Sequence, residues 1–309
     1  MNKILKYLKN PFHLFGYLGR RGVFNWMPDS LYLKILYRIE VGYWPNLSNP
    51  QTFNEKLQWL KIHDRKPEYT QFVDKYEVRK HIAETIGEEY LIPLLGVWDK
   101  FDDIDFSKLP EQFVLKCTHD SGGLVICKDK SNLDIKRAKK KIERCLKKNY
   151  YWDGREWPYK SVKSRIIAEK YMVDESETEL KDYKIFCFDG ESKIIQVDFD
   201  RFVEHKRNLY DTEWNLCDFT LLYKNGKQKQ IPKPAQLEKM LEFAKTLSKN
   251  IPFVRVDFYC INNDIRWGGG YTLWRTHFLP RGRTWKVQSY RNRSIIRRMA
   301  QVAKGRKVI

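Results

Sequence analysis

Residues 182–201, DYKIFCFDGESKIIQVDFDR, decide the fold class. Two runs rich in β-branched and aromatic residues flank Asp189-Gly190, a dipeptide typical of the two-residue turn between antiparallel strands. The segment therefore predicts a β-hairpin. Two more hairpins are indicated by residues 111–129, EQFVLKCTHDSGGLVICKD, and by residues 253–267, FVRVDFYCINNDIRW, where Asn262-Asn263 forms the turn.

Helical patterns separate these hairpins. Thr52 and Glu55 form a capping-box pattern at the start of a helix. Residues 70–87 predict a single amphipathic helix that ends at Gly87, and further helices are predicted over residues 135–148 and 234–250. Strands that pair through hairpins and are interspersed with helices predict an α+β fold rather than a doubly wound parallel sheet.

The basic residues of the chain are unevenly distributed. The net charge is +19 over 309 residues, but residues 266–309 contain twelve Lys and Arg and no Asp or Glu, which leaves +7 for the first 265 residues. A mildly basic body is typical of a protein that handles anionic ligands such as nucleotides. Binding of nucleic acid or anionic lipid through the tail remains an alternative.

The location of the protein is indicated by several absences in the sequence. The six cysteines form no C-x-x-C pair, which favours reduced thiols in the cytoplasm. No apolar run is long enough for a transmembrane helix. Residues 1–22 are basic and amphipathic without a signal-peptide pattern, so we expect a surface helix or a peripheral contact with the inner face of the membrane.

Four short motifs place charged residues where chemistry is possible. Lys116 lies in an apolar strand and precedes the loop HDSGG, residues 119–123, whose backbone N–H groups can approach a phosphate. The spacing of a Walker A loop is absent, and a plain β-turn beside an edge lysine is the alternative. Glu169 ends a strand, which suits either a solvated strand end or the edge of a nucleotide site.

The other two motifs each place an acid and a base on one strand face. Asp182 and Lys184 share a face, as do Arg255 and Asp257, because side chains alternate along a strand. Each pair is either an ion pair or part of a site. In the second case, Asp182 and Lys184 would contact ribose and phosphate, and Asp257 would bind Mg²⁺ beside a phosphate-binding Arg255.

The order of these motifs resembles the TupA-like ATP-grasp family of bacterial polysaccharide gene clusters. The matching phrases are NPQTFNEKLQWLKIHDR, VDKYEVRKHI, FVLKCTHDSGG, IIAEKYM, DYKIFCFDG and VRVDFY, which together cover about residues 45–260. The resemblance implies an ATP-grasp fold in which two α+β subdomains clasp a nucleotide. It also implies a ligase reaction: ATP phosphorylates a carboxylate, and an amine then attacks the acyl phosphate and displaces phosphate.

The resemblance also implies a role for each matching position. Lys75 and Lys116 would contact the phosphates of ATP, Asp182 would hold the ribose, and Lys184 would be a further phosphate contact. Asp257 would bind Mg²⁺, and Lys116 and Arg255 would act on the transferring phosphoryl group. The remaining nucleotide contacts would be His119, Ser121, Gly122 and Gly123 in the loop and Glu169, Lys170 and Tyr171 at the adenine edge.

The chain departs from the family after Asp257. The family continues with a strand that reads close to FGE-[VL]-T, whose Glu is the second Mg²⁺ carboxylate, whereas this chain reads WGGGYTLWR from Trp267. One guanine inserted into a guanine run would convert a family-like WGEVTLYGG into this sequence. We therefore hypothesise that the residues after about Gly268 are out of frame, and we expect weak nucleotide binding with little or no turnover.

These observations predict four regions: a basic helical region over residues 1–45, an N-terminal α/β subdomain over 46–110, ATP-grasp subdomains over 111–265, and a poorly ordered basic tail over 266–309. The favoured function is an ATP-grasp carboxylate–amine ligase of capsule or exopolysaccharide biosynthesis, with ATP, Mg²⁺, a saccharide carboxylate and an amine as ligands. A glycosyltransferase is the alternative, because Asp198 to Asp200 fit a D-x-D metal pattern.

Overall fold

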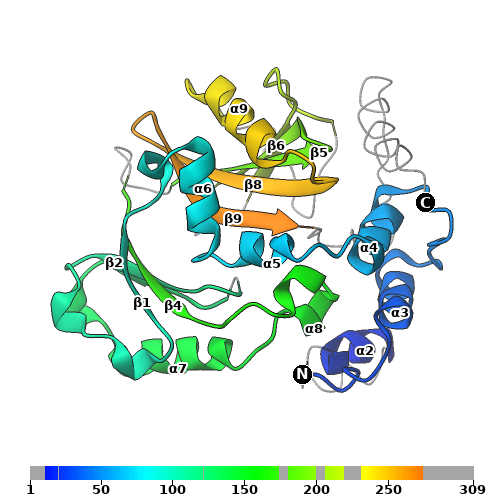
Figure 1. Ribbon diagram of the computed structural model, residues 1–309, viewed down its shortest axis with the longest axis horizontal. Helices are drawn as coiled ribbons and strands as arrows, with labels where there is room; N and C mark the ends of the chain where they lie inside the picture. The colour runs from blue at the N-terminus through cyan, green and yellow to red at the C-terminus, as the bar shows by residue number, and fades with distance from the viewer. Residues whose placement is uncertain are drawn as a thin grey trace.

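The computed structural model describes residues 11–19, 21–120, 122–173, 180–199, 206–218 and 231–273. Its strands form two antiparallel sheets (Figure 1). The first sheet has the order β1-β4-β2-β3, and the second has the order β7-β6-β5-β8-β9. The strands are β1 (Leu94–Trp98), β2 (Phe113–Cys117), β3 (Leu124–Cys127), β4 (Ile166–Lys170), β5 (Asp182–Phe188), β6 (Glu191–Phe199), β7 (Lys206–Tyr210), β8 (Phe253–Ile261) and β9 (Asp264–Leu273).

The predicted hairpins are confirmed. Phe188 pairs with Glu191, and Asp189 and Gly190 between them both have positive φ, as a type I′ turn requires. Asn262 and Asn263 likewise have positive φ between β8 and β9. Because every strand pairing is antiparallel, the prediction of an α+β fold is confirmed as well.

Helices cover the outer side of each sheet (Figure 1). The helix α7 packs on β2 and β3 of the first sheet, and α9 packs on β5, β6 and β8 of the second. The helices are α2 (Pro11–Gly19), α3 (Asp29–Val41), α4 (Phe53–His63), α5 (Glu68–Val73), α6 (Val78–Ile86), α7 (Ile135–Leu146), α8 (Tyr151–Gly154) and α9 (Leu237–Leu247). Short 3₁₀ turns occupy Glu88–Tyr90, Phe101–Asp103, Phe106–Lys108, Lys130–Asn132 and Trp157–Tyr159.

Two hydrophobic cores correspond to the two sheets. The smaller core joins Phe113, Leu115 and Ile166 of the first sheet to Ile142 of α7. The larger core joins the second sheet to α4, α5, α6 and α9. Residues from α5 and α6 therefore belong to the core of the second sheet, although they precede the first sheet in sequence.

The capping box predicted at the start of α4 is present. The Thr52 hydroxyl accepts the N–H of Glu55, and the Glu55 carboxylate accepts the N–H of Thr52. The prediction of one helix over residues 70–87 is wrong, because the helix is broken between Val73 and Val78 into α5 and α6. The second helix still ends at Gly87, which has positive φ.

Two predicted boundaries cross paired strands. β1 lies within residues 46–110 but pairs with β4, so the first sheet draws strands from both sides of residue 110. β9 runs to Leu273, so the first residues of the tail predicted from residue 266 form a strand paired with β8. Residues 274–309 lie outside the described part of the chain.

Candidate functional site

Lys75 occupies the break between α5 and α6. Its backbone N–H donates to the carbonyl oxygen of Thr118 at 3.1 Å. Its Nζ donates to the carbonyl oxygens of Cys117 at 3.2 Å and Thr118 at 3.4 Å, and also to that of Asp120. Burial lowers the pKa of Lys75 to about 8. Lys75 thus reaches the loop between β2 and β3 through the loop carbonyls, and its predicted contact with ATP phosphates stays a prediction.

Asp74 and Arg165 fix this break, and sequence reasoning missed both. One oxygen of Asp74 accepts the backbone N–H of Tyr76 at 2.8 Å, which competes with continuation of the helix. The other oxygen accepts Nη2 of Arg165 at 2.8 Å, and the Arg165 guanidinium lies over the Tyr76 ring. The signal in the sequence is an Asp within the helical pattern, because an Asp side chain readily accepts the backbone N–H groups two and three residues further on, as Asp74 does here.

The loop after β2 is held by its own side chains. The carboxylate of Asp120 accepts the N–H of Gly123 at 2.9 Å, and a Cβ at Gly123 would lie 2.3 Å from Sγ of Cys117. His119 is 2% exposed, and its Nε2 donates to the carbonyl oxygen of Cys145 in α7 at 3.0 Å. The His119 ring is therefore anchored to α7. Ser121, another predicted loop contact, lies outside the described residues.

Glu169 sits between two cations. Its Oε2 accepts Nζ of Lys116 at 2.5 Å, and its Oε1 accepts Nη1 of Arg79 at 3.2 Å. Arg79 also donates to the carbonyl oxygen of Ile92 at 2.8 Å. Glu169 is 3% exposed, and a buried carboxylate stays charged only when it is paired in this way. The sequence had indicated Lys116 and Glu169, but not Arg79.

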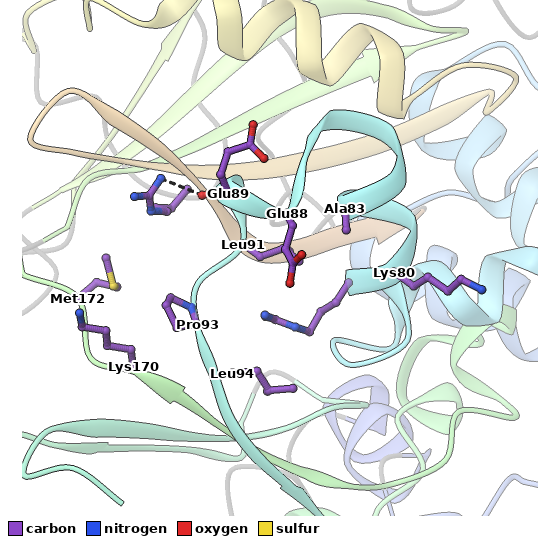
Figure 2. Close-up of a pocket in the computed structure, with 11 residues that line it drawn as sticks. Lys80, Ala83, Glu88, Glu89, Leu91, Pro93, Leu94, Lys170 and Met172 are labelled. Carbon is purple, nitrogen blue, oxygen red and sulfur yellow. Dashed lines mark hydrogen bonds between the residues drawn. The ribbon is translucent and has the colours of Figure 1, made fainter.

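A pocket of about 630 Å³ lies next to this pair (Figure 2). We call it the α6 pocket, because Arg79, Lys80 and Ala83 of α6 form one wall. The other walls come from residues 88–94, from the end of β4 and from β9: Glu88, Glu89, Leu91, Pro93, Leu94, Lys170, Met172 and Arg266. Figure 2 shows Lys170 and Met172 opposite α6. The pocket therefore includes Lys170 of the predicted adenine edge and residues from both sheets.

The second sheet carries six charged side chains on the face opposite α9, four of them buried and two, Arg207 and Arg255, half-buried. We call them the ion-pair row: Asp182, Lys184, Asp198, Arg207, Arg255 and Asp257. Lys184 pairs with Asp182 and, at 3.2 Å, with Asp198, whose other oxygen accepts Nε of Arg207 at 2.6 Å. Lys184 stands directly opposite Asp257 in the β5–β8 register. Asp182 and Lys184 therefore lie together as predicted, as an ion pair.

Asp257 is held by Arg255. Nε and Nη2 of Arg255 donate to the two carboxylate oxygens of Asp257 at 2.7 and 2.6 Å. Burial raises the pKa of Asp257, against the opposing effect of the Arg255 and Lys184 cations. Asp257 also lies against Gly270 of β9, where a Cβ would be 2.3 Å from its Oδ2.

The donor set at Asp257 does not fit Mg²⁺, which in proteins binds one or two carboxylates and waters in octahedral geometry. Both oxygens of Asp257 are engaged by Arg255. Among the described residues, no group of three or more His, Cys, Asp or Glu is arranged to hold a metal ion. In this arrangement Asp257 serves as the partner of Arg255.

The D-x-D pattern is also engaged in ion pairs. Asp198 is 2% exposed and accepts from Lys184, Arg207 and Nε2 of Gln196. Asp200 lies outside the described residues. No observation on Asp198 favours the glycosyltransferase alternative.

Lys75, Lys116 and Asp257 lie close to one another, although 182 residues separate the first from the last in the sequence. The charge of Lys116 contributes to the lowered pKa of Lys75. A Cβ built at Gly269 would lie 3.7 Å from Nζ of Lys116, and the next residue, Gly270, contacts Asp257. The glycines of β9 thus connect the lysines of the first sheet to the ion-pair row of the second.

The sequence profile of the TupA-like ATP-grasp family matches residues 55–276, which is more than half of the chain. The match ends shortly after Gly268 and does not test the reading-frame hypothesis. No curated protein matches the chain.

Solved structures of ATP-grasp ligases resemble this one weakly. A D-alanine–D-alanine ligase from Bacillus anthracis complexed with ATP is 19% identical, covers 66% of this chain and 54% of its own, and gives a TM-score of 0.39. An ATP-grasp RimK domain protein from Sphaerobacter thermophilus is 11% identical, with coverages of 77% and 69% and a TM-score of 0.43. The ligase PsnB, complexed with a phosphomimetic precursor variant, Mg and ADP, is 8% identical, with coverages of 72% and 58% and a TM-score of 0.36.

This chain spans 54% of the length of the Bacillus anthracis ligase. At these identities and TM-scores, the likenesses carry no argument about substrates.

Proposed function

The chain belongs to the TupA-like ATP-grasp family, and from this premise we propose that it binds ATP as a carboxylate–amine ligase-type protein of cell-surface polysaccharide biosynthesis. The observation that carries the proposal is the meeting of Lys75 and Lys116 beside Glu169 and the α6 pocket. These residues come from three separate segments and leave an excess of positive charge beside a pocket.

The ligand would lie along the line from the pocket to the lysines. The base would enter the α6 pocket against Lys170 and Met172, and the phosphates would extend toward Lys116 and Lys75. A flexible lysine ammonium is a compact charge suited to a phosphate oxygen. Nζ of Lys75 would exchange its carbonyl partners for phosphate, and Glu169 would keep Lys116 pointed toward the ligand.

Turnover would be poor in this chain. When bound, ATP supplies the phosphoryl group that activates a carboxylate, and developing charge on that group needs fixed positive charge around it. Here Arg255, proposed to face the transferring group, is engaged by Asp257 at 2.7 and 2.6 Å. Glycines occupy positions 268–270, where the family resemblance implies a second carboxylate. We therefore propose nucleotide binding with little ADP release.

The test compares two lysine variants by calorimetric titration with ATP. K116A removes a charge beside Glu169, and we expect it to weaken ATP binding about tenfold or more, since a charge-assisted hydrogen bond contributes about 1.5–3 kcal/mol. K136A removes an exposed lysine of α7 and is the matched control, with unchanged affinity. Equal affinities of K116A and the wild-type protein for ATP would overturn the proposed site.

The proposed acceptors are a saccharide carboxylate and an amine, which fits the gene clusters in which the family is found. The proposed location is the cytoplasm, with a peripheral contact to the inner face of the membrane through the basic N-terminal region. Among the described residues, no helix has both the length and the apolar character needed to cross a bilayer.

A further inference from the structure

Exposed apolar side chains are concentrated in one short part of the chain. Nine large apolar side chains are exposed in the described residues, and five of these lie between residues 23 and 44. The five are Val23, Trp26, Leu31, Tyr43 and Trp44. We call them the N-terminal apolar surface. Single exposed apolar residues are ordinary on proteins, so closeness in sequence alone does not mark a contact, and the kind of side chain and the nearby charge must indicate the partner.

The two tryptophans are the most exposed of the five. Trp26 is 75% exposed and Trp44 is 62% exposed, whereas Trp267 in the core is 1% exposed. Tryptophan is the side chain that membrane proteins enrich where bilayer meets water, because its ring is apolar and its N–H is polar. Two free indoles therefore favour an interfacial environment over bulk water.

The helix α3 carries Leu31 and separates the other four residues in sequence, and it is firmly attached to the body. Tyr32, Leu33 and Tyr37 form its buried side. Asp29, at its first turn, accepts Nη2 of Arg65 and the hydroxyl of Tyr151, both at 2.6 Å. Leu31 and Lys34 remain exposed on α3. Because Tyr32, Leu33 and Tyr37 already pack α3 against the body, the exposed residues of α3 are not needed for its packing.

The cation Arg155 strengthens this attachment. Its guanidinium lies 4.5 Å from the ring centres of both Tyr32 and Trp152, and its Nη2 donates to the carbonyl oxygen of Phe24 at 2.6 Å. Arg155 is 1% exposed. Arg155 therefore fixes the segment before α3 to the body of the protein. The exposed side chains Val23 and Trp26 of this segment point into solvent.

The excess of positive charge in residues 1–45 indicates which class of partner the N-terminal apolar surface would contact. Residues 1–45 contain seven Lys and Arg and two Asp and Glu. One of the two acids, Asp29, is already paired with Arg65 and Arg155. Two copies of a chain segment with this excess of positive charge would repel each other, which disfavours self-association through it. An anionic lipid surface attracts each nearby Lys or Arg by about 1 kcal/mol and accepts tryptophan at its headgroup level.

We infer that the N-terminal apolar surface docks the protein on an anionic bilayer, with Trp26 and Trp44 inserted at headgroup level. The inference rests on the proposed peripheral location and names the residues that would create it. Figure 1 shows α2 and α3 at the end of the molecule away from α6. Docking through this surface therefore leaves the α6 pocket open to solvent.

The experiment is flotation of the full chain with vesicles. The wild-type protein should float with phosphatidylcholine vesicles that contain phosphatidylglycerol, and much less with pure phosphatidylcholine. The W26S/W44S variant should lose most of this binding. The I126S/I135S variant removes exposed apolar side chains elsewhere, at 44% and 47% exposure, and should float like the wild-type protein.

Three outcomes would overturn the inference. Flotation of W26S/W44S at the wild-type level, together with loss in K3E/K6E/K9E, would assign docking to the basic residues before residue 11. Flotation that does not depend on phosphatidylglycerol would remove the role of charge. A wild-type protein that binds no vesicles would refute the surface and the peripheral location together. ATP titration of W26S/W44S should match the wild-type protein, so the ligase proposal is judged separately.

Discussion

The two sheets differ in the balance of their charged side chains. The first sheet has more cations than carboxylates near Glu169, and the second has equal numbers of each. On the first sheet, Lys116 and Arg79 share a single carboxylate, Glu169, and Lys75 nearby donates only to backbone carbonyl oxygens of the loop after β2. On the second sheet, the ion-pair row sets three cations against three carboxylates. The lysines therefore retain positive charge for an anionic ligand, while the row is neutral by itself. The comparison teaches that the excess of one charge, rather than the number of charges, distinguishes a binding site from a structural network.

The largest effect is expected in the ion-pair row, from D257A. This change leaves the half-buried Arg255 without its bidentate partner, and because breaking a fully buried pair costs about 3–5 kcal/mol of stability, we expect a loss near the lower end of that range. Urea unfolding measures the loss. The double variant R255M/D257L removes both charges and should be much closer to the wild-type stability. If D257A is as stable as the wild-type protein, the ion-pair row does not stabilise the fold, and the proposed difference in role between the two sheets is refuted.

A smaller loss is expected from G270A. The new Cβ would lie 2.3 Å from Oδ2 of Asp257, so the carboxylate or the strand must move, and overpacking of this kind costs about 1–3 kcal/mol. Thermal unfolding measures it. The control is the same change made in D257A, where the closest contacts, to Oδ2 and Cγ, are gone and only the Cβ at 2.9 Å remains, so the cost should be clearly smaller. Additive losses in the two variants would show that Gly270 and Asp257 are not coupled.

The smallest effect concerns the lysines and depends on pH. Burial lowers the pKa of Lys75 to about 8 from 10.5, so Lys75 loses its charge in the folded protein as pH rises through about 8. We expect affinity for ATP to fall severalfold across this range. In K75R the side chain remains charged, because arginine does not titrate there, and the fall should disappear. An identical pH profile in the two proteins would exclude Lys75 from the site.

The lowered pKa of Lys75 also predicts how the stability of the fold changes with pH, and this change has the opposite sign to the change in ATP affinity. The unfolded protein binds more protons than the folded protein between about pH 8 and 10.5, because only the unfolded Lys75 is fully charged there. The contribution of Lys75 to stability should therefore increase with pH across this window, while ATP affinity decreases. Divergence of the two curves would separate the effect of Lys75 on binding from general alkaline unfolding.

Much of the architecture could be predicted from local sequence. Asp189-Gly190 and Asn262-Asn263 specify their turns because few residues accept positive φ, and Thr52 with Glu55 specifies a helix start by reciprocal hydrogen bonds. The break at Lys75 was missed because residues 70–87 keep a helical apolar pattern across it. The break depends on Arg165, which lies 91 residues beyond Asp74 in the chain.

The sequence by itself determined the antiparallel α+β class, the family, and which lysines and carboxylates were candidates. Turn geometry and apolar periodicity are short-range properties, and a family match depends only on the order of residues. Only the tertiary structure decided which charge meets which. Glu169 is shared by Lys116 and Arg79, and Asp257 is held by Arg255 rather than left free. Charges interact through space at a few ångströms, so their balance at each place follows from how distant strands pack.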